Sequence, residues 1–515
     1  MLIVCAGIAL AFRMICLDQR PLHTDEAVHA VKFGKLLEDG DYYYDTYEYH
    51  GPTLNFFTLI PAWFLCQRKL EEVNEYTLRM VPAIFGTCLI LLMLLIKNYI
   101  QKPTLLFASM LVAISPALVF YSRYYIQEML LVFFTFGFLF CLIRWLDSRK
   151  TGWAIGSGIF LGLMHATKET WIISMSMIII SAMILQWISR KDAGEFSSFG
   201  SRDLKNLGWL ILTFFIISGL FFSSFFNNPQ GIVDSFAAFS HYFNKAGNFS
   251  IHIHPWYFYL QLLTINQGAE GIWSEIFILI AGISGFIFAI RQRKSAEGRI
   301  FLFLGIYSLL LGTVYSILPY KTPWNLLQFY TGWVILAGYG ISMTLGVITS
   351  NKIKRFIYLL LAAVVLQLIY QTYQLNFKYG ADPSNPYVYG HTTNDIFRLV
   401  KELEHILEAQ PSPEIIQIEI IGSNHDYWPL PWYFRAYPHT GWWDHVDRNH
   451  PPAPIIIASP EFKDEILEKL YELPPPGERY LFLPLFDRSL ELRPQVYLEG
   501  YVRKDIWDAY ISHSK

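Results

Sequence analysis

Carboxylate and imidazole side chains gather in one stretch near the start of the chain. Residues 18–51 hold eight Asp and Glu against three Lys and Arg. Asp25 and Glu26 lie just after an apolar run, within the sequence His-Thr-Asp-Glu-Ala-Val-His. A carboxylate at such a position can act as a general base that deprotonates an acceptor hydroxyl as the hydroxyl attacks a sugar carbon. We therefore expect Asp25 and Glu26 to be catalytic, with imidazoles of the same stretch as substrate-binding candidates: His23, His29 and His50.

Three basic residues at the ends of other apolar runs could face these acids. Arg123 closes the run 104–121, and Lys168 lies between the runs 152–167 and 170–188. Lys321 lies in Tyr-Lys-Thr-Pro-Trp-Asn, between two later runs. Each could be a single residue whose charged head reaches the membrane surface. If all three converge opposite the acidic stretch, they would suit the phosphate of a lipid-linked substrate.

The elements that position these residues must be membrane helices. Of the 515 residues, 53% are hydrophobic and 16% are charged, whereas soluble proteins carry about 25% charged residues. The 140 residues from Asn376 onward hold 34 Asp, Glu, Lys and Arg, and the 375 residues before them hold only 48. We expect a transmembrane domain at 1–375 and a soluble domain at 376–515. The composition excludes a general nucleic-acid binder, which needs a basic field, and a disordered chain, which lacks apolar content.

A membrane helix needs about 20 largely apolar residues. Eleven such runs are present: residues 2–17, 77–96, 104–121, 125–146, 152–167, 170–188, 207–226, 271–290, 300–318, 326–348 and 355–373. Lys and Arg gather in alternate loops, at 97–102, 144–150, 190–205, 291–299 and 352–355. The positive-inside rule makes these loops cytoplasmic. We therefore expect an integral protein of the plasma (inner) membrane, with a cytoplasmic N-terminus and an extracytoplasmic C-terminal domain.

Two further outer segments are predicted, a first loop at 18–76 and a second at 227–270. Within the first, the run 53–66 is apolar but only 14 residues long, which suits an interfacial or re-entrant helix better than a span. In the soluble domain, strand candidates at 415–421, 454–458 and 480–485 alternate with helix candidates at 393–409 and 460–470. This alternation predicts an α/β domain with a small, mostly parallel sheet.

Seven short blocks follow one another in the order of a known family. They are Arg20-Pro-Leu-His-Thr-Asp-Glu-Ala-Val-His29, Tyr49-His-Gly-Pro52, Leu78-Arg-Met-Val-Pro-Ala-Ile-Phe-Gly86, Tyr121-Ser-Arg-Tyr-Tyr-Ile-Gln-Glu128, Ala166-Thr-Lys-Glu169, Lys321-Thr-Pro-Trp324 and Trp428-Pro-Leu-Pro-Trp-Tyr-Phe-Arg435. On these blocks the chain resembles the GT-C class of polytopic glycosyltransferases, specifically glycosyltransferase family 39, which holds the protein O-mannosyltransferases and aminoarabinose transferases. It looks closest to the subfamily described as flippase-activity-associated membrane proteins.

The resemblance implies an inverting transferase that takes a sugar from a polyprenyl-phosphate donor and passes it to a protein, lipid or glycan acceptor. In such enzymes the acidic pair of the first outer loop is catalytic, which would give that role to Asp25, with Glu26 beside it. A second acidic residue usually follows the next outer arginine, which points to Arg123 and Glu128. We therefore expect a GT-C-like fold of about 11 transmembrane helices that works at the lipid bilayer.

The resemblance leaves the phosphate contacts and the metal requirement open. Val28 and His29 stand where the aminoarabinose branch has Arg and Tyr, so His29 or Lys168 would have to make the same phosphate contact. No cofactor is certain. Asp25, Glu26 and Glu128 could ligate Mg²⁺ or Mn²⁺, although this branch generally resembles metal-independent enzymes.

Two other signals and a rival function also stay open. His252 and His254 could ligate a metal or form a structural pair, and an aromatic set could stack on a sugar or pack against the membrane: Trp428, Trp432, Tyr433, Trp442 and Trp443. The rival function is a flippase, or an accessory to one, for lipid-linked sugars. A transporter would place charges near the bilayer midplane on broken helices, whereas the predicted spans are nearly free of charge inside, Arg13 being the exception.

Overall fold

The computed structural model describes residues 2–40, 42–46, 50–192, 201–245, 252–268 and 271–513. The chain forms two compact units. The first, the membrane unit, comprises residues 1–17, 35–68 and 75–389. The second, the soluble unit, comprises residues 18–34, 69–74 and 390–515. Two pieces of the first predicted outer loop thus belong to the soluble unit, and the helix α2 (Thr24–Asp39) begins in the soluble unit and ends in the membrane unit.

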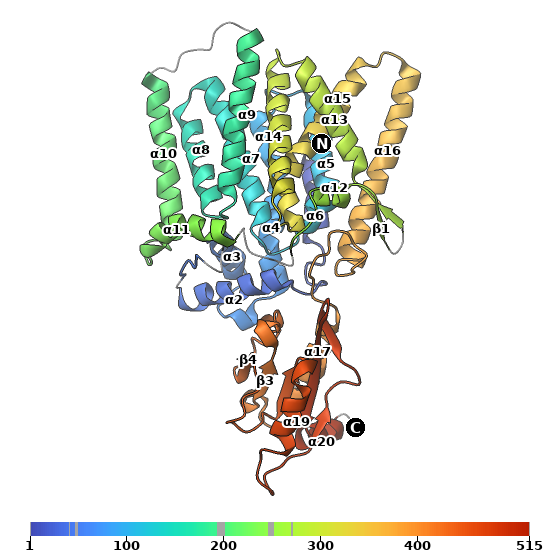
Figure 1. The fold of residues 1–515 in the computed structure, drawn as a ribbon. Helices are drawn as coiled ribbons and strands as arrows, with labels where there is room; N and C mark the ends of the chain where they lie inside the picture. Colours follow the sequence, from blue (N-terminus) through green and yellow to red (C-terminus); the bar gives the residue numbers. More distant parts are fainter. Residues whose placement is uncertain are drawn as a thin grey trace. The chain divides into compact units, whose positions relative to one another are not determined.

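The long helices of the membrane unit run side by side as a bundle (Figure 1). Its helices are α1 (Leu2–Met14), α3 (Thr53–Phe64), α4 (Glu75–Leu92), α5 (Lys102–Ile114), α6 (Pro116–Tyr121), α7 (Glu128–Ser148), α8 (Thr151–His165), α9 (Trp171–Asp192), α10 (Ser201–Phe222), α11 (Gln230–Lys245), α12 (Phe258–Leu263), α13 (Ile276–Arg291), α14 (Ala296–Ile317), α15 (Leu326–Val347) and α16 (Asn351–Tyr373). Short turns η2 (Met93–Ile96), η3 (Pro323–Asn325) and η4 (Gln374–Lys378) join them, with a hairpin of β1 (Asn266–Gly268) and β2 (Gly271–Trp273).

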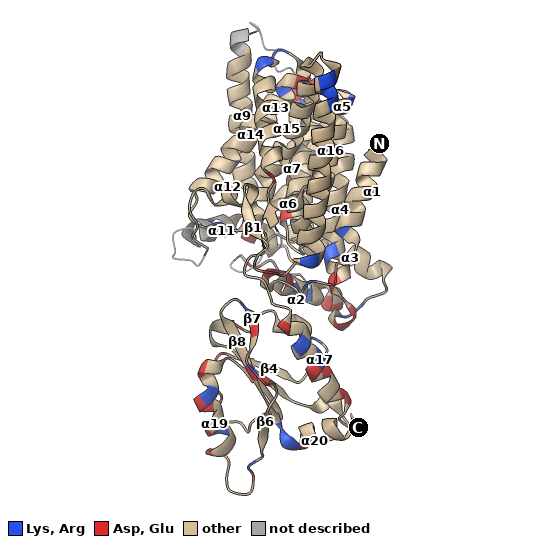
Figure 2. Cartoon of the chain, turned by 90° about the vertical axis from the view of Figure 1, so that its right-hand side faces the viewer, with Lys and Arg blue, Asp and Glu red and all other residues tan. Residues whose placement is uncertain are grey.

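Six helices among the described residues are long and apolar enough to cross a membrane, by length and composition. They lie at Glu75–Ile96, Glu128–Ser148, Trp171–Ser189, Ser201–Phe222, Ala296–Ile317 and Asn351–Lys378. Each of the other predicted spans also contains helix, but the number of eleven spans stays a prediction. Figure 2 shows almost no charge along the bundle, and Lys and Arg gather at the end where α5 begins and α13 ends.

The predicted span 104–121 is broken into two helices. α5 ends at Ile114 and α6 starts at Pro116, because a proline has no N–H to continue the helical hydrogen bonds. Arg13, the one charge predicted inside a span, is buried in α1. Its guanidinium donates to the carbonyl oxygens of Ala9, Val112 and Ala113 at 2.9–3.4 Å, so this buried charge has hydrogen-bond acceptors close by.

The soluble unit is an α/β domain built on a six-stranded sheet of order β4-β3-β5-β8-β6, with β7 also paired to β8. Its strands are β3 (Ile418–Ile421), β4 (Thr440–Trp443), β5 (Ile455–Ala458), β6 (Phe482–Pro484), β7 (Leu490–Arg493) and β8 (Val496–Arg503). Its helices are α17 (Asp395–Glu408), α18 (Leu430–Tyr433), α19 (Lys463–Tyr471) and α20 (Lys504–His513), with turns η1 (Leu70–Glu72), η5 (Pro413–Ile415), η6 (Ser423–His425) and η7 (Pro460–Phe462).

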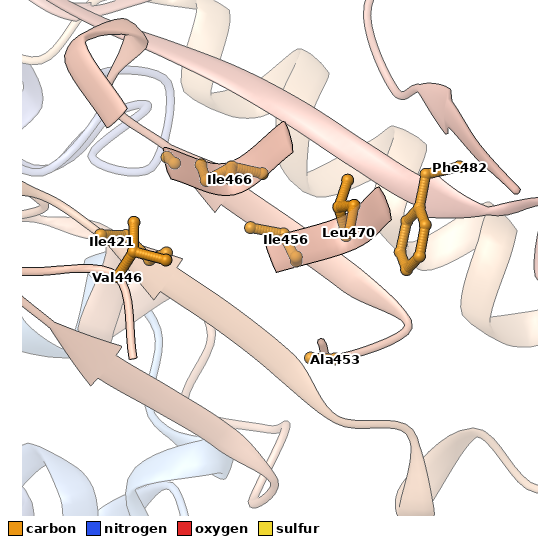
Figure 3. Packing of buried hydrophobic residues seen from close by; sticks show 8 residues of the cluster. Ile421, Val446, Ala453, Ile456, Ile466, Leu470 and Phe482 are labelled. Atoms are coloured by element: carbon orange, nitrogen blue, oxygen red, sulfur yellow. The ribbon is translucent and has the colours of Figure 1, made fainter. Parts of the chain in front are cut away.

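The expectation of a mostly parallel sheet is wrong. β3 pairs in parallel with β4 and β5, but β8 pairs antiparallel with β5, β6 and β7. The core lies between the sheet and α19, where Ile466 and Leu470 face Ile421 and Ile456 (Figure 3). The central strands β3 and β5 are buried on both faces, as is expected where both faces of a sheet are covered.

Candidate functional site

Within the soluble unit, the acidic pair lies in the first turn of α2. His23 is the residue before the helix, and its ring Nδ1 accepts a hydrogen bond from the backbone N–H of Asp25 at 3.1 Å. In return, the carboxylate of Glu26 accepts the backbone N–H of His23 at 2.9 Å. This reciprocal arrangement is a capping box in which histidine takes the place of serine or threonine. It fixes the start of α2 and therefore the position of Asp25.

The two carboxylates have different surroundings. Glu26 is fully buried, and Arg20 donates to both of its oxygens at 3.1 and 3.2 Å. The side chain of Asp25 is 47% exposed and lies 3.9 Å from Nδ1 of His23. His29, on the same helix, is buried. Glu26 therefore holds the loop together, while the carboxylate of Asp25 is partly exposed.

Hydrogen bonds within the soluble unit attach residues 18–34 to its C-terminal part. The backbone N–H of Leu22 donates to the hydroxyl of Tyr433 at 2.9 Å, and Thr392 donates to the carbonyl of Leu22 at 2.6 Å. Arg435 donates to the carbonyl oxygens of Leu70 and Val73 at 3.1 and 2.8 Å. Part of the last predicted block, around Tyr433 and Arg435, thus anchors the segment that carries Asp25.

In the membrane unit, a second group of polar residues surrounds the segment between α8 and α9. The segment is held at Ala166 and Thr167 by Thr53, through a backbone hydrogen bond of 3.1 Å and a hydroxyl pair at 2.8 Å. The two backbones meet closely at Gly51, where an added Cβ would lie 2.3 Å from the carbonyl oxygen of Ala166. Only glycine allows this approach.

Lys168 forms a buried ion pair with Glu128, the first residue of α7. Their side chains are 7% and 4% exposed. Oε2 of Glu128 makes no hydrogen bond to any described residue, so the carboxylate has an acceptor position left over. The pairing joins two of the predicted site residues, although they lie 40 positions apart.

The next residue, Glu169, forms a second polar cluster with His50, a predicted site residue, and with Tyr44, which was not predicted. Its carboxylate lies 2.8 Å from Nδ1 of His50 and accepts the hydroxyl of Tyr44 at 2.9 Å. Burial alone would raise the pKa of Glu169, but the charge and hydrogen bond of His50 and the hydroxyl of Tyr44 lower it to about 2. Glu169 ends the block Ala166-Thr-Lys-Glu169, but the sequence alone does not mark it as a site residue. The only sequence feature that indicates a role for Glu169 is its position beside a lysine at the end of an apolar run.

Arg123 and Lys321 are bound to backbone carbonyls. The guanidinium of Arg123 donates to four residues at the end of α1, at 2.7–3.3 Å, and lies 4.7 Å from the ring centre of Phe377. Nζ of Lys321 donates to the carbonyl oxygen of His254 at 2.8 Å. These contacts give both residues a structural role at loop and helix ends. Convergence of Arg123, Lys168 and Lys321 on one phosphate stays a prediction.

The described residues contain no group of three or more His, Cys, Asp or Glu side chains placed to hold a metal ion. His252 and His254 instead lie 2.7 and 2.9 Å from one hydroxyl, that of Tyr389, which fits the structural alternative for this pair. The hypothesis of a Mg²⁺ or Mn²⁺ ion stays untested.

Comparisons with known proteins match both the sequence and the fold. Residues 58–194 match the family model described as dolichyl-phosphate-mannose-protein mannosyltransferase. No curated protein sequence matches the chain.

Two solved structures share the fold over most of the chain. ArnT from Cupriavidus metallidurans, bound to undecaprenyl phosphate, is 13% identical over 97% of each chain, with a TM-score of 0.64. The oligosaccharyltransferase AglB from Archaeoglobus fulgidus, bound to an inhibitory peptide and a dolichol-phosphate, is 14% identical, with a TM-score of 0.55. That match covers 90% of this chain and 69% of AglB.

These matches confirm the predicted fold class, a helical membrane domain followed by a C-terminal sheet domain. Membership of the flippase-activity-associated subfamily stays a prediction. The chain is therefore an integral membrane protein that shares its fold with the glycosyltransferases ArnT and AglB.

Proposed function

We propose that the chain is an inverting glycosyltransferase that moves a sugar from a polyprenyl-phosphate donor to a protein, lipid or glycan acceptor on the outer face of the membrane. The observation that carries this proposal is the shared fold with ArnT over 97% of both chains, in a structure that holds undecaprenyl phosphate. The match of residues 58–194 to a family named for a dolichyl-phosphate sugar agrees with it.

Asp25 is the proposed general base. Its half-exposed carboxylate takes the proton of the acceptor hydroxyl while the hydroxyl oxygen forms a bond to the anomeric carbon. The bond between that carbon and the donor phosphate oxygen breaks on the opposite side of the sugar, which inverts the configuration. The polyprenyl phosphate leaves with the electron pair of the broken bond. Glu26 supports this base by holding Arg20 and the start of α2.

Lys168 and His50 are the proposed partners of the donor phosphate. The leaving phosphate gains negative charge, and fixed cationic donors in a water-poor site stabilise such charge strongly. Lys168 is buried and already paired with one carboxylate oxygen, so it is held in place before the donor binds. Glu128 holds that lysine in position. The membrane location of these helices suits a donor whose polyprenyl chain lies in the bilayer.

A mass-spectrometric comparison of cells with and without the gene tests the proposal. Loss of the protein should remove one sugar from surface glycans, lipids or proteins while its polyprenyl-phosphate sugar accumulates. Return of the parental chain should restore the product, and the Asp25→Asn variant should not. If the polyprenyl-phosphate sugar instead fails to reach the outer face, the flippase function becomes the better account.

A further inference from the structure

The end of the second predicted outer loop, together with the β1–β2 hairpin, carries exposed apolar side chains and no charge. Residues 252–268 and 271–274, which we call the platform, contain no Asp, Glu, Lys or Arg. Six large apolar or aromatic side chains of the platform are 47–66% exposed: Ile253, Trp256, Tyr257, Leu260, Ile265 and Ile272. Exposed apolar surface of this extent marks contact with a membrane or with another protein.

The hairpin has one buried face and one exposed face. Asn266 pairs with Trp273, and Gln267 pairs with Ile272, so the two side chains of each pair lie on the same face. Trp273 is buried, whereas Gln267 and Ile272 are exposed. Ile265, which directly precedes β1, is exposed as well. The outer face of the hairpin is therefore uncharged and mainly apolar.

The platform is fixed to the membrane unit by hydrogen bonds. In α12, the hydroxyl of the buried Tyr259 donates to the carbonyl oxygen of Thr322 at 3.3 Å. The backbone N–H of Lys321 donates to the carbonyl oxygen of His252 at 2.9 Å. Figure 1 shows α12 and the hairpin at the end of the bundle where α13 begins. The exposed side chains are thus held on the outside of the bundle.

The exposed face of the hairpin continues an apolar stripe of α13. Five isoleucines at helical spacing along this helix are 39–58% exposed: Ile276, Ile280, Ile283, Ile287 and Ile290. On the opposite side of the helix, Gly285 packs against α15, where an added Cβ would lie 2.2 Å from the carbonyl oxygen of Leu336. Small residues form such contacts between membrane helices, so the isoleucine stripe faces lipid. Ile272 lies four residues before Ile276, at the end of this stripe.

We propose that the platform lies in the headgroup region of the bilayer, away from the Lys- and Arg-rich end of the bundle, and that lipid covers its exposed face. Trp and Tyr side chains gather at membrane–water interfaces, which suits Trp256 and Tyr257. Ile265 and Ile272 then reach about 5–10 Å into the boundary between headgroups and acyl chains. The platform brings no charged side chain into the bilayer. This inference does not rest on the proposed function.

Fluorescence quenching of the full-length chain in phosphatidylcholine nanodiscs tests the proposal. A genetically encoded fluorescent amino acid replaces Ile265 or Ile272 in separate samples, so that the test does not depend on one position. Ile283 in the stripe of α13 is the lipid-exposed control. Ile415 of the soluble unit, which is 66% exposed, is the water-exposed control. Phosphatidylcholine brominated along its acyl chains quenches labels in the bilayer, and iodide quenches labels in water.

We expect brominated lipid to quench the labels at Ile265 and Ile272, and both labels to lose most of the iodide quenching seen at Ile415. Their depth should be shallower than that of Ile283, which lies seven residues beyond Ile276 and thus about 10 Å farther along α13. Iodide quenching equal to that at Ile415 would overturn the proposal. Protection from both quenchers would overturn it as well, because a second copy of the chain or another protein would then cover the platform.

Discussion

Removal of the buried lysine of the membrane unit should affect stability and donor binding separately. In Lys168→Met the carboxylate of Glu128 stays buried without its cation, in a site where the two side chains are only 7% and 4% exposed. Loss of one partner of such a pair costs about 3–5 kcal/mol. Replacement of both partners by apolar residues of similar volume is often neutral. We therefore expect Lys168→Met to be strongly destabilised and Lys168→Met with Glu128→Leu to recover most of the stability.

Donor binding should not recover in the same way. If Lys168 contacts the donor phosphate, the double variant still lacks a charge-assisted contact worth about 1.5–3 kcal/mol, which is tenfold or more in affinity. Thermal unfolding in detergent and binding of a polyprenyl-phosphate sugar measure the two effects on the same samples. The pair of Arg149 and Asp203, at 2.9 Å in the same unit, supplies the control, and its double replacement should leave binding unchanged. A stable double variant of Lys168 and Glu128 with parental affinity would refute the phosphate contact.

Three further predictions follow from the same structure. In the soluble unit, Lys469→Met should lower the free energy of unfolding by about 3–5 kcal/mol, because Lys469 and Glu419 form a buried pair at 2.6 Å. Faster hydrogen exchange of β3 would show this loss, and unchanged protection of β3 would contradict the prediction. Reporter fusions after Arg149, Lys294 and Lys354 should report the cytoplasm, and a fusion after Lys515 the outside; a cytoplasmic C-terminus would overturn the loop-charge argument. The folded pKa of Glu169 lies below its ordinary value, at about 2. Ionised Glu169 therefore contributes about 3 kcal/mol to the free energy of unfolding. This contribution is present above about pH 4.5 and is lost as the pH falls toward 2. In thermal unfolding, Glu169→Gln should abolish this loss.

Much of the membrane unit could be predicted from the sequence, because the bilayer demands long apolar runs and satisfied backbone groups. Each predicted run contains a helix. The break between α5 and α6 also has a local cause in the sequence, Ser115 followed by Pro116. The prediction used apolar content alone and therefore treated the two helices as one span.

The soluble unit was harder to predict for a different reason. Buried and half-buried residues alternate along most of β8. Its antiparallel partners β5, β6 and β7 are short strands, and β5 lies far from β8 in the sequence. Strand direction depends on such pairings, which a local pattern does not contain. The attachment of residues 18–34 to this unit through Tyr433 and Thr392 is likewise a tertiary contact across more than 350 positions.

The candidate site shows the same division. The position of Asp25 and Glu26 after an apolar run is enough to select them as candidates. Arg20, six residues before Glu26, also indicates from the sequence which of the two acids has a basic partner. Glu169 could not be assigned in that way. Its partner His50 lies 119 positions away, so the significance of the acid follows only from the fold.

The most direct test of the account is sugar transfer by Asp25→Asn. Asparagine nearly matches the size of aspartate but cannot accept the proton, and the side chain is 47% exposed, so folding and donor binding should stay close to parental. Transfer should fall by about 10²-fold or more, the typical worth of general-base catalysis. Glu26→Gln should instead reduce stability, since it weakens the contacts with Arg20 and His23. If folded Asp25→Asn transfers sugar at the parental rate, Asp25 is not the base and the proposed mechanism is wrong.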